Sequence, residues 1–319
     1  MKEIGGYFEL ELSRGEGSFL HSDGCPVNSG RHALEYILRS LGDKVTKVWL
    51  PYYTCDVVLQ PFIRLGLEYG FYNTNPDFEI ASHPDLKAGE YIIANNYFGI
   101  KDSYIRDLAG MYGDRLIVDN AQAWYAPVLP GIKSFYSPRK FFGVPDGGVA
   151  YIRNAPPLDL EVDYSADRCS HLLKRIDENA TAGYVDFRTN SDTLNKDNIK
   201  RMSKLTKSLL SSINMEKAKE TRLANFHYLS EYLNSENMLN LPATNCFDCP
   251  MVYPFMSKDP SLRKRLIENK VYVATYWPNV LKSCSEDTPE YQLTQDILPL
   301  PVDQRYGKDE MKKIIDIIL

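Results

Sequence analysis

Apolar and polar residues follow two different periods along the first half of the chain. Apolar residues recur at helical spacing over 33–41, 57–65 and 104–112, and short apolar runs fall between them at 45–50, 67–72, 90–94, 116–119 and 148–152. A three- to four-residue spacing predicts amphipathic helices, and short apolar runs predict buried strands. Strands that alternate with helices predict an α/β fold with a mostly parallel sheet flanked by helices.

The pattern changes after residue 154. Residues 155–197 are polar and irregular apart from a short helical run at 171–176, which predicts a linker and a surface insertion. Helical stripes follow at 199–213 and 215–233, then a strand at 251–255, a helix at 261–269, a strand at 271–273 and a helix at 308–319. We therefore expect a large α/β domain over 1–197 and a small α+β domain over 198–319.

Composition narrows the classes of protein. The chain has 319 residues, 44% hydrophobic and 25% charged, as in ordinary globular proteins, and its net charge of −5 argues against nucleic acid as a partner. No apolar run approaches the length of a membrane span and no signal segment is recognisable, so we expect a cytoplasmic protein without a membrane partner. Six scattered cysteines predict neither a disulfide framework nor a metal site.

Several polar and aromatic residues come directly after predicted strands. In an open parallel sheet, ligands bind beyond the carboxyl ends of the strands, so residues at these positions are expected to share one edge. The candidates are Tyr53, Asn96, Asp119, Gln122 and Lys140.

Lys140 lies in a turn-rich stretch that runs from Ser134 to Gly148. Alone, such a stretch is a tight loop between two strands. A carboxylate at the end of the buried run Leu116–Asp119, followed about 20 residues later by this lysine, instead suits pyridoxal 5′-phosphate chemistry. The lysine amine would hold the cofactor aldehyde as a Schiff base, and Asp119 would keep the pyridine nitrogen protonated.

A phosphate site is expected where the first helix begins. The run Asn28-Ser-Gly-Arg31 opens the helical pattern, so free backbone amides and the Ser29 hydroxyl lie together at a helix amino terminus. A plain serine N-cap is the alternative interpretation of the same residues.

Together these segments resemble the DegT/StrS family of pyridoxal-phosphate-dependent sugar aminotransferases, which have the aspartate aminotransferase fold. The resemblance runs nearly end to end. The matching segments are Asn28-Ser-Gly-Arg-His-Ala-Leu34, Pro51-Tyr-Tyr-Thr-Cys55, Asn96-Tyr-Phe-Gly99, Asp119-Asn-Ala-Gln122, Pro138-Arg-Lys140 with Asp146-Gly-Gly148, Arg201-Met-Ser203, Trp277-Pro278 and Leu300-Pro-Val-Asp-Gln-Arg-Tyr306.

The resemblance implies a role for each matched residue. Lys140 would be the Schiff-base lysine and the base that moves the substrate proton, and Asp119 would pair with the pyridine nitrogen. Gln122 would lie near the phenolic oxygen of the cofactor. The amides of Ser29, Gly30, Arg31 and His32 would hold the phosphate, and Tyr53, Cys55 and Asn96 would contribute to the cofactor site.

Three positions depart from the family pattern. The family has a phosphate-binding serine where this chain has Phe135, so one of the flanking serines, Ser134 or Ser137, is expected to replace it. Cys55 stands where many members place an aromatic ring, so that either Tyr53 stacks on the cofactor instead or the stacking is weaker. Arg31 and His32 replace small residues at the phosphate site and would add a charge-assisted contact or crowd it.

The implied function is transfer of an amino group, with glutamate as the expected donor, to a keto group of a nucleotide-linked sugar in amino-sugar or surface-polysaccharide biosynthesis. Two alternatives stay open. One is a ligand-binding or regulatory protein that has kept the fold and lost activity; the other is a related sugar dehydratase, although that branch replaces the lysine with histidine. The resemblance also implies a homodimer, with the segment around 201–203 completing the neighbouring site.

Overall fold

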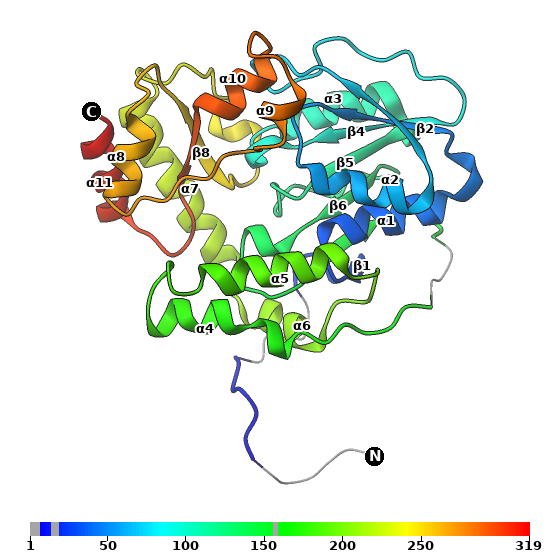
Figure 1. Ribbon diagram of the computed structural model, residues 1–319, viewed down its shortest axis with the longest axis horizontal. Coiled ribbons are helices and arrows are strands. Elements are labelled where there is room, and N and C mark those ends of the chain that lie inside the picture. The colour runs from blue at the N-terminus through cyan, green and yellow to red at the C-terminus, as the bar shows by residue number, and fades with distance from the viewer. Residues whose placement is uncertain (1–6, 14–18, 156–158) are drawn as a thin grey trace.

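The computed structural model describes residues 7–13, 19–155 and 159–319, and its centre is a seven-stranded sheet between layers of helices (Figure 1). Five neighbouring strands are parallel, as the sequence predicts, whereas β7 runs antiparallel to β6, and β1 antiparallel to β7. Across the sheet the strands are β1 (Cys25–Val27), β7 (Gly148–Tyr151), β6 (Lys133–Tyr136), β5 (Leu116–Asn120), β4 (Glu90–Asn95), β2 (Lys47–Pro51) and β3 (Glu68–Tyr72).

Helices cover both faces of this sheet. α1 (Gly30–Leu41) and α2 (Gln60–Leu65) share one apolar core with Ile117 of β5, and α3 (Asp102–Tyr112) shares another with Val118. Because successive strand residues point to opposite faces, Asp119 faces the side of α1 and Asn120 the side of α3. The face on which each strand-end residue lies is therefore fixed.

The C-terminal part contains a second, two-stranded sheet of β8 (Val252–Met256) and β9 (Ile297–Pro301). The helices here are α7 (Met215–Leu233), α8 (Leu262–Glu268), α9 (Val280–Ser283), α10 (Pro289–Asp296) and α11 (Lys308–Ile318). The strand predicted at 271–273 is wrong. Val271 and Val273 are buried on one side, but the Val271 N–H bonds to Leu266 O and closes the turn after α8. β9 pairs with β8 instead.

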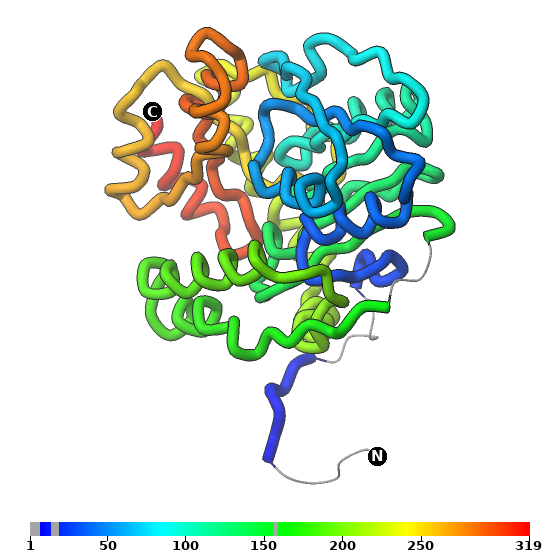
Figure 2. The backbone as a smooth tube through the Cα atoms, turned by 45° about the vertical axis from the view of Figure 1, so that its right-hand side comes forward, coloured from blue at the N-terminus to red at the C-terminus, as the bar shows by residue number. Residues whose placement is uncertain are grey.

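Residues 159–197 contain more helix than the sequence predicts. The short run near 171–176 is confirmed as α4 (Ser170–Asp177), but α5 (Tyr184–Lys196) was expected to be irregular. α4 and α5 lie side by side as a hairpin (Figures 1 and 2). α5 buries only Asn190 and Leu194, so it has no apolar stripe from which a helix could be predicted.

The helix predicted over 199–213 begins later than expected. α6 (Lys204–Ser212) starts after the N-cap Ser203, whereas residues 198–202 extend along the segment before α1. Ser203 is buried and bonded to Asp146 of its own chain. The Ser203 N–H and hydroxyl are thus bonded within their own chain, and the role implied for 201–203 at a neighbouring subunit's site stays a prediction.

Segments distant in the sequence meet at the start of α1. Gly147 has φ +123° and donates its N–H to Asn28 O at 2.8 Å, and a side chain on Gly148 would lie 2.2 Å from Ser29 O. Only glycine fits this close approach of two backbones. The loop that carries Lys140 is thereby held against the start of α1.

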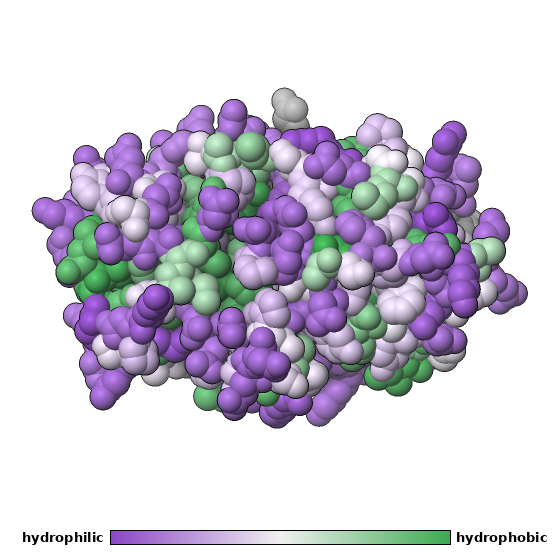
Figure 3. Space-filling model, turned by 90° about the horizontal axis from the view of Figure 1, so that it is seen from above, coloured by the Kyte–Doolittle hydropathy of each residue, from purple (hydrophilic) through white to green (hydrophobic). Residues whose placement is uncertain are grey.

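The surface seen in Figure 3 is mostly hydrophilic, with apolar side chains gathered mainly toward the C-terminal part at the left of the view. Among the described helices, none is both long enough and apolar enough to cross a membrane.

Candidate functional site

Asp119 lies buried at the carboxyl end of β5, opposite Asn95 of β4 and Phe135 of β6. Its Oδ1 accepts a hydrogen bond from the Ala121 N–H at 2.8 Å. Burial raises the pKa of this carboxyl group, whereas the positive charge of Lys140 and the Ala121 N–H act to lower it. A cationic group placed against Asp119 would stabilise the ionised form.

Lys140 ends the single 3₁₀ turn Pro138–Lys140 after β6 and is exposed. Its side chain forms no ion pair or hydrogen bond within the residues that the structure describes. Its charge acts on the carboxyl group of Asp119 and on the thiol of Cys55, whose pKa burial raises. The structure therefore brings these three predicted residues to one edge of the sheet, as expected for consecutive parallel strands.

The start of α1 confirms the capping interpretation of Ser29. Ser29 Oγ accepts the His32 N–H at 3.3 Å and lies 2.9 Å from His32 Nδ1. Burial and then the charges of Arg64 and Arg31 lower the pKa of His32 to about 4, so the imidazole is neutral at pH 7. As the first two helical residues, Gly30 and Arg31 have N–H groups without an intrahelical acceptor, and these can face an anion.

Ser137 and Ser134 lie on different sides of the sheet. Ser137 abuts the start of α1, since a Cβ on Gly30 would lie 3.3 Å from its Cβ and 3.6 Å from its Oγ. Ser137 is 8% exposed, and its hydroxyl has no hydrogen-bond partner within the described residues. Ser134 pairs with Val118 and faces α3, where its Oγ lines a small cavity. Of the two predicted serines, only Ser137 lies at the helix start.

The structure places the side chain of Asn96 away from Asp119. Its amide donates to Asp102 Oδ1 at 2.6 Å and Asn120 Oδ1 at 3.1 Å, on the α3 side. The sequence analysis missed the preceding Asn95, which pairs with Asp119 and shares its face. Asn95 donates to a threonine hydroxyl, and its buried Oδ1 has no partner. The two-residue period of a strand was the signal that could have distinguished the two asparagines.

Gln122 presents one free amide group. Its Oε1 accepts the Phe98 N–H at 3.0 Å, which fixes the side chain, whereas its buried Nε2 has no partner in the described residues. A buried N–H donor without an acceptor is costly, so this group is suited to an acceptor on a ligand.

Tyr53 is completely buried in an aromatic cluster with Phe78, Tyr97 and Trp277. Its hydroxyl has no partner among the described residues, and burial raises its pKa. The ring predicted to stack on a cofactor is thus packed between residues of three other chain segments, while Cys55 is half-buried next to Lys140.

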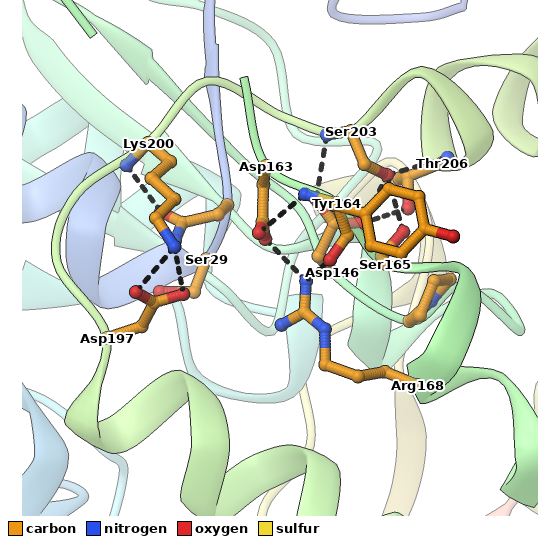
Figure 4. Close-up of polar contacts among 12 residues, drawn as sticks. Ser29, Asp146, Asp163, Tyr164, Ser165, Arg168, Asp197, Lys200, Ser203 and Thr206 are labelled. Carbon is orange, nitrogen blue, oxygen red and sulfur yellow. Dashed lines mark hydrogen bonds and ion pairs between the residues drawn. The ribbon is translucent and has the colours of Figure 1, made fainter. Parts of the chain in front are cut away.

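A second buried carboxylate supports the loop after Lys140. Asp146 is 0% exposed and accepts from the Ser203 N–H at 2.9 Å and hydroxyl at 2.7 Å, and from the Thr206 hydroxyl (Figure 4). Ser165 extends this network by donating to Ser203 Oγ at 2.7 Å. The start of α6 is therefore tied to the loop between Lys140 and β7.

The site has a cationic side that the sequence analysis identified only in part. Arg31 was predicted, but Arg139, immediately before Lys140, was missed. Burial and then the charge of Arg31 lower the pKa of Arg139 to about 10. The groups gathered at the site are an amine, a carboxylate and anion-binding groups, and no cluster of residues suited to a metal ion occurs in the described parts of the chain.

No protein-family model matches this chain, and no curated protein sequence matches it. Solved structures are similar to this chain. A DegT DnrJ EryC1 StrS aminotransferase from Brucella abortus is 18% identical with TM-score 0.62, covering 92% of this chain and 84% of that one. Spr1654 from Streptococcus pneumoniae, solved in its PLP form, is 14% identical with TM-score 0.64, covering 93% and 87%. DesI, solved in the presence of its TDP-sugar product, is 14% identical with TM-score 0.62, covering 92% and 79%.

Proposed function

We propose that this chain is a pyridoxal-phosphate-dependent aminotransferase that acts on a nucleotide-linked keto-sugar, with glutamate as the amino donor. The structural similarities show that it has the fold of these aminotransferases, as the sequence resemblance predicted. The observation that carries the proposal is that a buried carboxylate, Asp119, and an exposed lysine, Lys140, share one sheet edge beside a helix start, and that Lys140 has no hydrogen-bond or ion-pair partner among the described residues.

The residues present fit the cofactor. Lys140 Nζ would bind its aldehyde covalently, Asp119 its pyridine nitrogen, and the free Nε2 of Gln122 its phenolic oxygen. The N–H groups of Gly30 and Arg31 and the Ser137 hydroxyl would bind its phosphate. Ser29 and His32 would hold the helix start in shape, because their side chains bond to each other. When bound, the cofactor supplies a ring that withdraws electrons from the substrate carbon.

The chain's own groups then perform the proton movements. Lys140 would be the base at the sheet edge that carries the proton to and from the substrate carbon. Asp119 would stabilise a positive charge on the cofactor ring, and its burial would strengthen that interaction. Because Lys140 is exposed, a substrate as large as a sugar nucleotide can approach it from solvent.

The visible spectrum tests the proposal. After incubation with pyridoxal phosphate and removal of unbound cofactor, the purified protein should retain a yellow Schiff-base band, and glutamate should bleach the band because the amino group passes to the cofactor. A keto-sugar nucleotide should then restore the band. A protein that binds the cofactor but is not bleached by any amino donor would favour the regulatory alternative, and one that stays colourless would refute both cofactor-dependent enzymes, the aminotransferase and the dehydratase.

We also propose a homodimer. Supporting this, large apolar side chains are exposed on and before the α4–α5 hairpin, namely Val162, Tyr164, Leu173, Ile176, Tyr184, Val185 and Phe187. Exposed apolar side chains gathered in this way are typical of a protein interface. Sedimentation velocity at micromolar concentration should give a dimer that dissociates when Ile176 and Val185 are replaced by Asp. A wild-type monomer would contradict the proposal.

A further inference from the structure

Two arginines beside the start of α1 have no carboxylate partner among the described residues. Arg31 donates to Gln60 Oε1 at 3.1 Å and to Asn195 Oδ1, and Arg139 donates to Ser191 Oγ at 3.2 Å. All three acceptors are neutral. Within the described residues, Asp56 and Asp146 therefore act on these two guanidinium groups only at longer range, and neither group has a carboxylate at ion-pair distance.

Two neighbouring arginines show the usual arrangement. Arg64 pairs with Glu35 at 3.3 Å and Arg168 with Asp163 at 2.5 Å. The absence of a carboxylate at Arg31 and Arg139, within the residues that the structure covers, is thus a local feature and not a general property of this region.

The two unpaired guanidinium groups converge. Ser191 and Asn195 are four residues apart on α5, so they lie on one helix face about one turn apart. Arg31 follows Gly30 at the start of α1, and Arg139 lies two residues after Ser137, which contacts Gly30. The backbones of the two arginines therefore lie on either side of the Gly30–Ser137 contact. Their guanidinium groups both bond to the same face of α5.

Holding these charges together without an anion is costly. Burial lowers the pKa of both guanidinium groups, and the charge of Arg31 lowers that of Arg139 further, whereas Asp56 and Asp146 act in the opposite direction. Both arginines are partly buried, and a partly buried charge is stabilised by pairing with an anion. Two positive charges match a phosphate monoester, which carries a charge of about −1.5 to −2 at neutral pH.

We propose that Arg31 and Arg139 form an arginine pair that binds a dianionic phosphate monoester at the start of α1. The N–H groups of Gly30 and Arg31 and the free Ser137 hydroxyl supply the remaining hydrogen bonds. Ser191 and Asn195 of α5 hold the guanidinium groups in place. The identification of this phosphate as that of pyridoxal phosphate rests on the proposed function, but anion binding at the pair does not require Lys140.

Calorimetric titration with inorganic phosphate at constant ionic strength tests the pair without any vitamin B6 compound. Arg31→Gln and Arg139→Gln should each weaken phosphate binding about 10- to 100-fold, because each removes a charge-assisted contact. Arg139→Lys should recover part of the affinity, because it keeps the charge. Arg39→Gln on the same helix should have no effect on phosphate binding, because Arg39 pairs with Glu35 and is not part of the proposed phosphate site. Circular dichroism establishes that each variant is folded.

A second titration separates the two proposals. Both glutamine variants should lose affinity for pyridoxal phosphate while keeping wild-type affinity for pyridoxal, which lacks the phosphate. Phosphate binding lost in the glutamine variants supports the arginine pair even if Lys140 never bonds to the cofactor. Wild-type phosphate affinity in folded Arg31→Gln and Arg139→Gln proteins would overturn it, whatever the spectrum shows.

Discussion

Lys140→Ala protein that has been incubated with pyridoxal phosphate and freed of unbound cofactor lacks the yellow Schiff-base band and has no detectable transaminase turnover. Alanine has no amine to bond with the aldehyde, and no other lysine has been placed at this sheet edge next to Asp119. Turnover should fall by at least about four orders of magnitude, as when other covalent-catalysis residues are removed. Absorbance spectroscopy and a coupled glutamate assay measure the two effects.

Lys140→Arg separates charge from nucleophilicity. Arginine keeps a positive charge beside Asp119, but its guanidinium is always protonated and cannot attack the aldehyde. It should therefore stay as inactive and colourless as the alanine variant while retaining the stability of the wild type. A yellow, active Lys140→Arg or Lys140→Ala protein would refute the assignment of Lys140.

Asp119→Asn should lower turnover about 10²- to 10³-fold while the yellow band persists. Asparagine has the same shape and its amide oxygen still accepts the Ala121 N–H, but it carries no charge to hold the pyridine nitrogen protonated. The ring then withdraws electrons less strongly from the substrate carbon. The loss should appear in kcat, and the wavelength of the band should shift because the ring changes its protonation state.

Asp102→Asn is the matched control for Asp119→Asn. Asp102 is also buried and its pKa is also raised by burial, but it is the first residue of α3 and bonds to Asn96 and the Asp248 N–H. Its replacement should reduce stability without shifting the band. Equal effects of the two substitutions on the band would mean that Asp119 does not contact the ring.

The sequence predicts the central sheet well because its strands are buried on both faces. The runs at 45–50, 90–94 and 116–119 are confirmed as β2, β4 and β5 within one or two residues. β9 was missed because prolines alternate with apolar residues along it, and proline is rare inside strands. α5 was missed because polar contacts, and not an apolar stripe, hold it in place.

The site was predictable where it depends on strand order and less so where it depends on side-chain direction. Parallel strands deliver their carboxyl ends to one edge, which brought Asp119 and Lys140 together. Adjacent strand residues point to opposite faces, so an error of one residue changes which side chain points to the ligand. Asn96 was predicted as the site residue, but Asn95 is the residue that lies beside Asp119. Arg139 was missed because nothing in its local sequence reveals a partner on α5.

The start of α1 is enclosed by segments that are far apart in the sequence and are therefore translated at different times. Residues 26–30 are held by Gly147 and Gly148 and by residues 200–202, and Asp146 is satisfied only by Ser203 and Thr206. A nascent chain that ends before about residue 206 has all the strands of the large sheet. It still lacks the contacts that residues 200–206 make around this helix start. We therefore expect cofactor binding only after residue 206 has been translated.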